Sequence, residues 1–456
     1  MNTRKEEDSL GPVSVPAESY GGSFYTRAKS YFRISGVTAP PNFRVALANV
    51  KKAAAKVNAE LGHLDMEYSK AIQKAADEFI EGKFDDFFDL DIYQAGAGTP
   101  FNMNLNEILA NRANEMLGGK VGEYSHVHPN DHVNMAQSSN DVIPTAIRIA
   151  AYIELIQLQI EGENLVKSLN EKAQEFQNLL KVGRTHLQDA VPITLGQEFR
   201  AYASAISNAL VRLKETSQEL TRLGIGGTAV GTGINTHPEF AKMMCTEISI
   251  LTGEKFSSAP NLFETTHSMG VFASVSSAVS LLAIEILRIT NDLRLMASGP
   301  KAGLNEINLK EIEPGSSIMP GKVNPSILEC MSMICVQISG MNHSVNLAAQ
   351  QGQFELNWHT PLIMSDLLHE IEIMKTGMYM LTEHCVKDIT ANNDVLQGEL
   401  DKSTALATAL APYMGYKEVA DLVNESLEIN VPLESLVPEE HKKHLQADEM
   451  TQPNRR

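Results

Sequence analysis

The chain has 456 residues, 43% of them hydrophobic and 21% charged, which is the composition of an ordinary globular protein with more than one domain. Its formal net charge of −18 argues against nucleic acids and anionic membrane surfaces as partners. An anionic ligand would therefore need a local group of hydrogen-bond donors inside a negative protein.

The N-terminal segment and the cysteines both favour the cytoplasm. The segment "MNTRKEEDSL" is charged and lacks the apolar core of a secretory signal. The four cysteines have neither CxxC spacing nor metal-ligand spacing with a histidine, so we expect buried free thiols. They are Cys245, Cys330, Cys335 and Cys385. We predict a cytoplasmic protein without a metal site.

Helical patterns begin after a segment rich in proline, glycine and tyrosine. Residues 1–40 show weak periodicity and are expected to form an extended arm. From about Pro41, the segment "LANVKKAAAKVNAEL" places small and apolar residues on one helical stripe, and "LNEILANRANEML" predicts another helix. We assign residues 1–136 to an N-terminal domain.

Five long periodic segments follow, and each is longer than most helices of globular proteins. They begin with "IPTAIRI", "TLGQEFR", "HSMGVFA", "SILECMS" and "LIMSDLL". In the first segment, Ile147, Ala151 and Leu158 share one face, and Pro144 suits a first helical turn. Long adjacent helices build bundles, so residues 137–393 are predicted to form a central bundle.

One of these segments is long and apolar enough to suggest a membrane span. Residues 267–284 contain no Lys, Arg, Asp or Glu. Their five serines, and the Glu285 and Arg288 that follow, favour instead a helix buried on all sides within the bundle. We therefore predict no membrane contact.

The periodic segments shorten after about residue 389. The remaining pattern predicts a small helical C-terminal domain at residues 394–456. The predicted fold class is therefore all-α, with a long central bundle between smaller N- and C-terminal domains.

Five polar loops interrupt the helical segments. They are "AGAGTPFNMNLNE", "HPNDHVNMAQSSND", "GRTHLQDAVP", "GGTAVGTGINT" and "PGSSIMPGKVNP". Glycine lets backbone N–H groups approach a ligand closely, helix N-termini add partial positive charge, and Lys322 adds a full charge. Brought together, these loops would bind carboxylates, because they lack the Asp, Glu and His ligands that a divalent metal needs.

Each loop alone has a plainer explanation. "GTAVGTG" suggests a dinucleotide-binding turn, but no predicted strand precedes it. "SSND" is typical of a helix N-cap, and His128, His132 and His186 taken singly are typical structural histidines. The case for a site therefore depends on the five loops together.

With these loops assembled, the sequence resembles the fumarase/aspartase superfamily from about Asp8 to the C-terminal domain. "GSSIMPGKVNP" is the signature loop of that superfamily, and the other blocks occur in the expected order. The resemblance implies a homotetramer whose long helices share one core and whose active sites combine loops of three subunits. It also implies reversible anti-elimination from a C4 dicarboxylate to fumarate through an aci-carboxylate intermediate, without a cofactor.

The resemblance places proton removal in the signature loop. Ser316 matches the general base, and a serine base needs a strongly lowered pKa inside a closed, mobile, donor-rich loop. Ser317 is a neighbouring donor, and Lys322 and Asn324 match the residues that hold the other carboxylate.

The other blocks supply further site residues by the same resemblance. The residues that match binders of the activated carboxylate and the leaving group are Thr99, Ser138, Ser139 and Asn140. Thr185 and His186 belong to the next block, and Glu329 matches a carboxylate that can partner His186. The residues that match a second, peripheral site of fumarases are His128, Asn130 and Asp131.

Two leaving groups fit this pattern, ammonia from L-aspartate and water from L-malate. The Thr99–Pro100 block, "GPKAGLNEINL" and Leu187 resemble the ammonia-lyases, whereas Ser139, "VHPND" and "APNLFE" resemble the hydratases. Hydroxide needs an acid, for which His186 is available, whereas ammonia leaves already protonated. Giving most weight to Thr99–Pro100, we predict an aspartate ammonia-lyase, with class II fumarate hydratase and a non-catalytic structural relative as alternatives.

Overall fold

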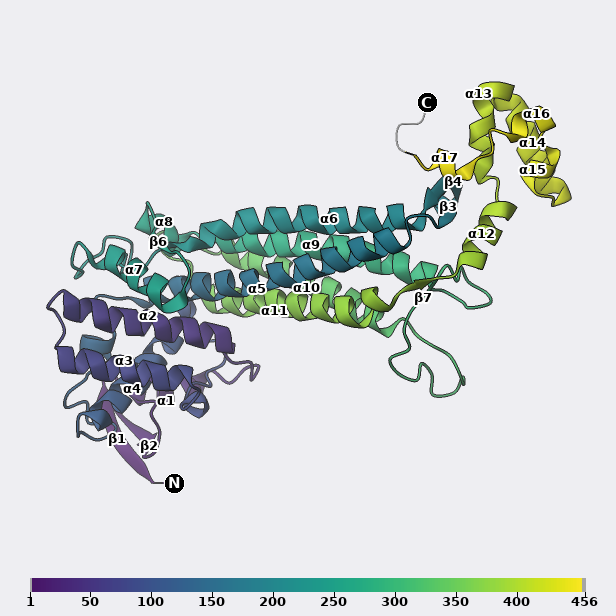
Figure 1. Ribbon diagram of the computed structural model, residues 1–456. Coiled ribbons are helices and arrows are strands. Elements are labelled where there is room, and N and C mark those ends of the chain that lie inside the picture. Colours follow the sequence, from purple (N-terminus) through teal and green to yellow (C-terminus); the bar gives the residue numbers. More distant parts are fainter. Residues whose placement is uncertain (1, 453–456) are drawn as a thin grey trace. The chain divides into compact units, whose positions relative to one another are not determined.

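The computed structural model describes residues 2–452. Helices dominate this part of the chain, and its strands form short two-stranded pairs, which confirms the all-α fold class (Figure 1). The chain divides into two compact units. Unit 1 comprises Met1–Leu158, Arg212–Ser280 and Gln337–Met374, and unit 2 comprises Gln159–Val211, Leu281–Val336 and Lys375–Arg456. The division into three domains stays a prediction. Residues 1 and 453–456 of the predicted terminal domains lie outside the described residues.

The N-terminal segment of unit 1 is not the expected extended arm. Strands β1 (Thr3–Asp8) and β2 (Gly11–Pro16) form an antiparallel hairpin, and helix α1 (Ser23–Tyr31) follows. The Arg27 guanidinium binds the Asp8 carboxylate at 2.7 and 3.0 Å and the Gly11 carbonyl at 2.9 Å. These contacts hold α1 against the hairpin turn. Because they join residues far apart in the sequence, the periodicity of the hydrophobic residues could not predict them.

Three helices complete the N-terminal part of unit 1. Helix α2 (Pro41–Glu60) begins at the predicted proline, and α3 (Met66–Ile80) and α4 (Thr99–Met116) follow. Proline suits a first helical turn because its missing N–H would have no helical partner there. The Phe43 and Phe101 rings, 5.9 Å apart between centroids, join α2 to α4 in the core.

The five predicted long helices are all present. They are α5 (Ser139–Glu175), α6 (Leu195–Ser217), α9 (Gly270–Met296), α10 (Ser326–Ala349) and α11 (Thr360–His384). Helix α5 begins before the predicted point, so Pro144 lies inside the helix and not in its first turn. Since proline has no N–H, the helical bond to the carbonyl of Asn140 cannot form.

Shorter elements join these helices. In unit 1 they are β5 (Arg222–Leu223), α7 (Phe240–Thr252), β6 (Ser257–Ser258) and α8 (Leu262–His267). In unit 2 they are β3 (Leu180–Thr185), β4 (Gln188–Thr194), β7 (Ile307–Asn308), β8 (Thr390–Ala391), α12 (Asn393–Lys402), α13 (Ala411–Met414), α14 (Tyr416–Ile429), α15 (Leu433–Leu436), α16 (Glu439–Lys442) and α17 (Ala447–Met450). Tighter 3-10 turns are η1 (Asp85–Phe87), η2 (Gly96–Gly98), η4 (Gln218–Thr221), η5 (Val386–Asp388) and η6 (Ala405–Leu410), whereas η3 (Pro129–Val133) is a wider, π-helical turn.

Helix α9 meets the length and composition of a membrane span, although half of its most apolar window is buried within the protein. The buried core helices of globular proteins pass the same test. Its other side carries exposed apolar side chains, among them Leu281 and Ile284, which are 47% and 53% exposed. The helix is therefore not buried on all sides within one chain.

Candidate active site

In unit 1, one buried carboxylate organises the start of α5. Asp141 accepts hydrogen bonds from the backbone N–H groups of Ser138 at 2.9 Å, Gly226 at 3.0 Å and Thr228 at 2.8 Å. Burial raises the pKa of Asp141 to about 6, and the three N–H groups oppose that rise. Sequence reasoning missed this residue, although Ser138 followed three positions later by an acid is the pattern of a capping box.

The glycine-rich loop "GGTAVGTGINT" is fastened to the same helix start. The Asn140 side-chain amide donates to the Ala229 carbonyl at 2.8 Å. Gly231 has φ +110°, and a Cβ there would lie 2.6 Å from the backbone nitrogen of Phe263. Gly231 therefore permits close packing of its loop against the backbone at Phe263. The hydrogen bonds between this loop and the side chains of Asn140 and Asp141 hold the start of α5 in a fixed arrangement.

Ser139 is buried at the first position of α5, beside the start of α4. Its hydroxyl accepts a hydrogen bond from the Asn102 amide at 3.1 Å. Thr99 and Pro100 occupy the first two positions of α4, and the N–H of Ala97 just before them donates to the Trp358 carbonyl at 3.0 Å. Unit 1 thus brings the Thr99 block and the Ser138–Asn140 block together.

In unit 2, Thr185 and His186 lie at the end of a β-hairpin that the sequence did not predict. Strands β3 and β4 pair antiparallel, with Thr185 opposite Gln188. His186 and Leu187 form the two-residue turn with φ of +56° and +60°. Such a turn favours Asn or Gly, so side chains here are held in a strained conformation. The hairpin presents the His186 imidazole to solvent.

A buried network of charges anchors this hairpin. Lys181 Nζ lies 2.8 Å from carboxylate oxygens of both Glu198 and Glu306. Arg184 binds Glu306 at 2.7 Å and Glu399 at 2.7 Å. Glu306 is fully buried and joins both cations. Arg184 directly precedes Thr185, so the network fixes the strand that carries the turn.

The signature loop folds back on itself around Ser316. The Ser316 Oγ accepts hydrogen bonds from the N–H groups of Ile318 at 3.2 Å and Met319 at 2.9 Å. Two donors on this oxygen would stabilise negative charge that develops on it. The arrangement suits a serine that removes a proton.

The ends of the same loop are pinned together. The Asn324 amide donates to the Gly315 carbonyl at 2.6 Å, and a Cβ on Gly315 would lie 2.1 Å from the Lys322 carbonyl oxygen. A cavity of about 450 Å³ lies inside the loop, lined by Ser316 and Lys322 among others. The proposed base and the only lysine of the loop therefore face one space.

Glu329 lies in the first turn of α10, with its carboxylate 4.0 Å from the Arg294 guanidinium. Across residues 2–452 of one chain, no hydrogen bond or ion pair joins Glu329 to His186. Their partnership stays a prediction.

The three residues of the predicted peripheral site form a local cap. The ring Nδ1 of His128 accepts from the N–H groups of Asn130 and Asp131, both at 3.3 Å. The His128 N–H donates to the ring of His132 at 2.9 Å. These bonds account for His128 as the cap of turn η3, and its role toward a ligand stays a prediction.

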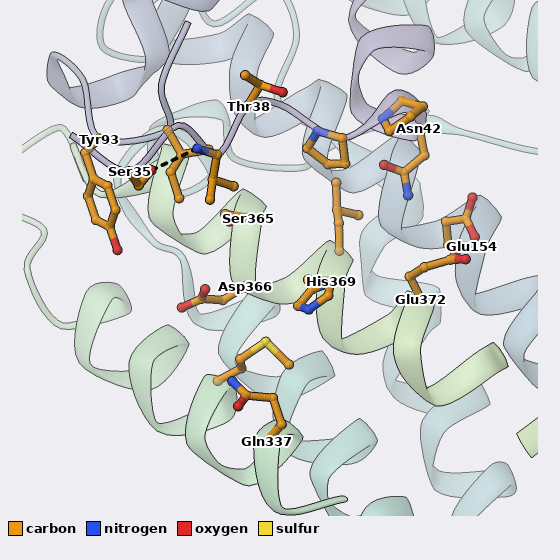
Figure 2. A pocket seen from close by; sticks show the side chains of 16 residues that line it. Ser35, Thr38, Asn42, Tyr93, Glu154, Gln337, Ser365, Asp366, His369 and Glu372 are labelled. Atoms are coloured by element: carbon orange, nitrogen blue, oxygen red, sulfur yellow. Dashed lines mark hydrogen bonds between the residues drawn. The ribbon is translucent and has the colours of Figure 1, made fainter. Parts of the chain in front are cut away.

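A large cavity in unit 1 contains none of the predicted site residues. It measures about 740 Å³, and Figure 2 shows Asp366 and His369 of α11 in its wall. Glu154 and Glu372 also line it. Three carboxylates would repel a dicarboxylate, so this cavity does not suit the predicted substrate. Within the described residues, no group of three or more His, Cys, Asp or Glu side chains is placed to hold a metal.

Comparison with known proteins places these residues in context. Residues 11–340 match a protein family described as Lyase. The fumarate hydratase class II 2 of Bradyrhizobium diazoefficiens is 44% identical over 99% of this chain and 97% of its own. The fumarate hydratase class II of Neisseria meningitidis is 44% identical over 95% and 94%.

Solved structures agree with these relatives. A class II fumarase from Schistosoma mansoni has a TM-score of 0.97 and 37% identity, with both chains covered completely. A fumarate lyase:delta crystallin from Brucella melitensis, bound to cobalt, has a TM-score of 0.95 and 40% identity over 99% of this chain and 100% of that chain.

The prediction of an aspartate ammonia-lyase is therefore wrong, because similar proteins over nearly the full length are named fumarate hydratases. The block that carried most weight, Thr99–Pro100, has a local explanation. Thr99 begins α4 and Pro100 is its second residue, a position that favours proline in any helix. The Ser139 block, given less weight, favoured the hydratases, which is the name that these similar proteins carry.

Proposed function

The chain belongs to the fumarase/aspartase superfamily of lyases, and from this we propose that it is a class II fumarate hydratase, interconverting L-malate and fumarate plus water. The chief support is the 44% identity to a fumarate hydratase over 99% of the chain. The folded signature loop, with two N–H donors on Ser316, supports the elimination chemistry of the superfamily and leaves the choice of leaving group to the identity.

Proton removal is the demanding step of this reaction. The proton lies on the carbon next to a carboxylate, and its loss places a second negative charge on that carboxylate. Ser316 takes the proton, and Lys322 and Asn324 hold the other carboxylate. Preorganised donors around the aci-carboxylate supply the largest part of the stabilisation, and Ser138, Ser139 and Asn140 are suited to that role.

Departure of the hydroxyl group requires an acid. Hydroxide is a poor leaving group, so a proton must reach its oxygen as the C–O bond breaks. His186 at the hairpin turn supplies that proton or holds the water that does, and Glu329 supports it from a neighbouring subunit. No step requires a cofactor, and the enzyme acts in the cytoplasm.

The active form is a homotetramer in which loops of three subunits complete each site. Support comes from apolar side chains left uncovered on the long helices. Leu281 and Ile284 of α9 are about half exposed, and Met333 and Val336 of α10 are 67% and 61% exposed. Exposed apolar patches of this kind mark surfaces that other chains cover.

The wild-type protein should form fumarate from L-malate and none from L-aspartate. The measurement is the ultraviolet absorbance of fumarate after the pure protein is mixed with either acid. In the reverse direction, hydration of added fumarate should lower the same absorbance. Fumarate formed from L-aspartate alone would contradict the proposed function. The same samples without protein serve as the control.

Shared active sites should allow two inactive variants to restore each other. Ser139→Ala and Ser316→Ala tetramers are each expected to be nearly inactive. After random mixing of subunits by co-expression, about a quarter of the sites would combine an intact Ser139 with an intact Ser316 from another chain. About a quarter of the wild-type rate is therefore expected. Mixed tetramers without recovered activity would show that both serines come from one chain.

A further inference from the structure

A lysine is buried among neutral amides in unit 1, next to the proposed site. Lys51 of α2 is fully buried. Its Nζ lies 3.0 Å from Asn134 Oδ1 and 3.0 Å from Gln137 Oε1. Burial lowers the pKa of Lys51 to about 7, against the opposing charge of Asp141. Burying an amine in this way is costly, and such residues cluster at functional sites.

Hydrogen bonds connect this lysine to Ser139 in two steps. The Asn134 oxygen that binds Lys51 also accepts from the Asn102 amide at 3.1 Å and from the Asn106 amide at 3.2 Å. The same Asn102 NH₂ donates to the Ser139 Oγ at 3.1 Å. In its ammonium form Lys51 has only donors to offer, so Asn134 turns its oxygen toward the lysine, and Asn102 then presents its NH₂ group.

The orientation of Asn102 decides what Ser139 can offer a ligand. The Ser139 oxygen accepts the Asn102 bond, so its own proton remains available to donate outward. If Asn102 were turned by half a rotation, its oxygen would instead draw that proton inward. The Asn102 Oδ1 is buried without a hydrogen-bond partner, so the present orientation is imposed by its neighbours and not by its own oxygen.

We propose that Lys51 is a positioning residue for the hydratase reaction, which through Asn134 and Asn102 holds the Ser139 hydroxyl as a hydrogen-bond donor to the substrate. This inference rests on the proposed function, because Ser139 is taken there as a binder of the reacting carboxylate. Lys51 does not touch the substrate. It fixes the direction of one donor, and a misdirected donor in a preorganised site costs rate more than binding.

The test begins with Lys51→Met, which keeps an unbranched side chain of nearly the same length and removes its donors. We expect kcat for L-malate dehydration to fall about 100-fold, with KM changed less than about threefold. Lys52→Met is the matched control, since Lys52 neighbours Lys51 on α2 but pairs with Asp77 at the surface. It should leave both constants unchanged. A Lys51→Met enzyme with wild-type kcat would overturn the inference.

A double-mutant cycle separates positioning from a purely structural role. If Lys51 acts through Ser139, Lys51→Met should cost less than about threefold in kcat when it is added to Ser139→Ala. An equal loss in both backgrounds would overturn the inference. Should Lys51→Met not fold, Lys51→Gln replaces it in the cycle, since glutamine keeps one donor group and removes the charge.

The experiments distinguish an error in the proposed function from an error in the proposed role of Lys51. The wild-type rates with L-malate and L-aspartate test the function alone, and the cycle is measured on whichever acid the wild type converts. Crystal structures of Lys51→Met and Lys52→Met add a readout that needs no turnover. The Asn102–Ser139 hydrogen bond should be lost only in Lys51→Met, and its survival there would contradict the inference.

Discussion

The Ser316→Ala substitution is expected to lower kcat for L-malate dehydration by about a thousandfold or more. A positioned base contributes on the order of 10² to 10⁴ in rate, and the methyl group of alanine cannot take a proton. Two backbone N–H groups point at the Ser316 oxygen, and the substitution leaves them without that acceptor. Initial rates of fumarate formation measure the effect.

KM should change little in this variant, because Lys322 and Asn324 still hold the substrate. Ser435→Ala, on the exposed surface of α15, is the matched control and should keep the wild-type rate. Unchanged thermal unfolding would show that the loss is chemical. If Ser316→Ala retained more than about a tenth of the wild-type kcat, another group would have to be the base.

The Glu306→Gln substitution is expected to lower the free energy of unfolding by about 3 kcal/mol. Glu306 is fully buried between Lys181 and Arg184, and removing one partner of a buried ionic network leaves the other charges uncompensated. The urea midpoint of unfolding, followed by circular dichroism, measures the change. Glu171→Gln, at an exposed position with a 4.0 Å ion pair, is the control and should shift the midpoint little.

The Glu306→Gln variant should also lose activity at urea concentrations below its unfolding midpoint. Arg184 precedes Thr185, so weakening its ion pair loosens the hairpin that carries His186. An unchanged urea midpoint would show that the glutamine amide satisfies both cations and that the network adds little stability.

The long helices could be predicted because each carries its own signal. Helix α2 begins at Pro41 as expected, and the five central helices follow from apolar periodicity alone. The hairpin of β3 and β4 could not be predicted in this way. Its turn residues are His186 and Leu187, which give none of the usual Asn-Gly signal, and its stability comes from Glu306, far away in the sequence.

The same distinction separates the predicted site residues from Lys51, which the sequence did not suggest. Ser316 and Lys322 lie in one short loop with a distinctive sequence. Lys51 lies in "KKAAAK", which has the composition of a solvated helix face, and only the packing of α2 against its neighbours buries it. The Thr99–Pro100 pair was weighted wrongly in the choice of leaving group, because a pair that starts a helix resembled a leaving-group pocket.

The hydrogen bond between Ala97 and the carbonyl of Trp358 gives the molecule an internal optical reporter. Trp358 is the only tryptophan in the chain, so its emission is not mixed with that of any other indole. A Cβ on Gly96 would lie 2.6 Å from the Cβ of Trp358, so movement of the segment before Thr99 must disturb the indole's surroundings. Fluorescence can thus follow movement of this segment, including in variants that no longer turn over.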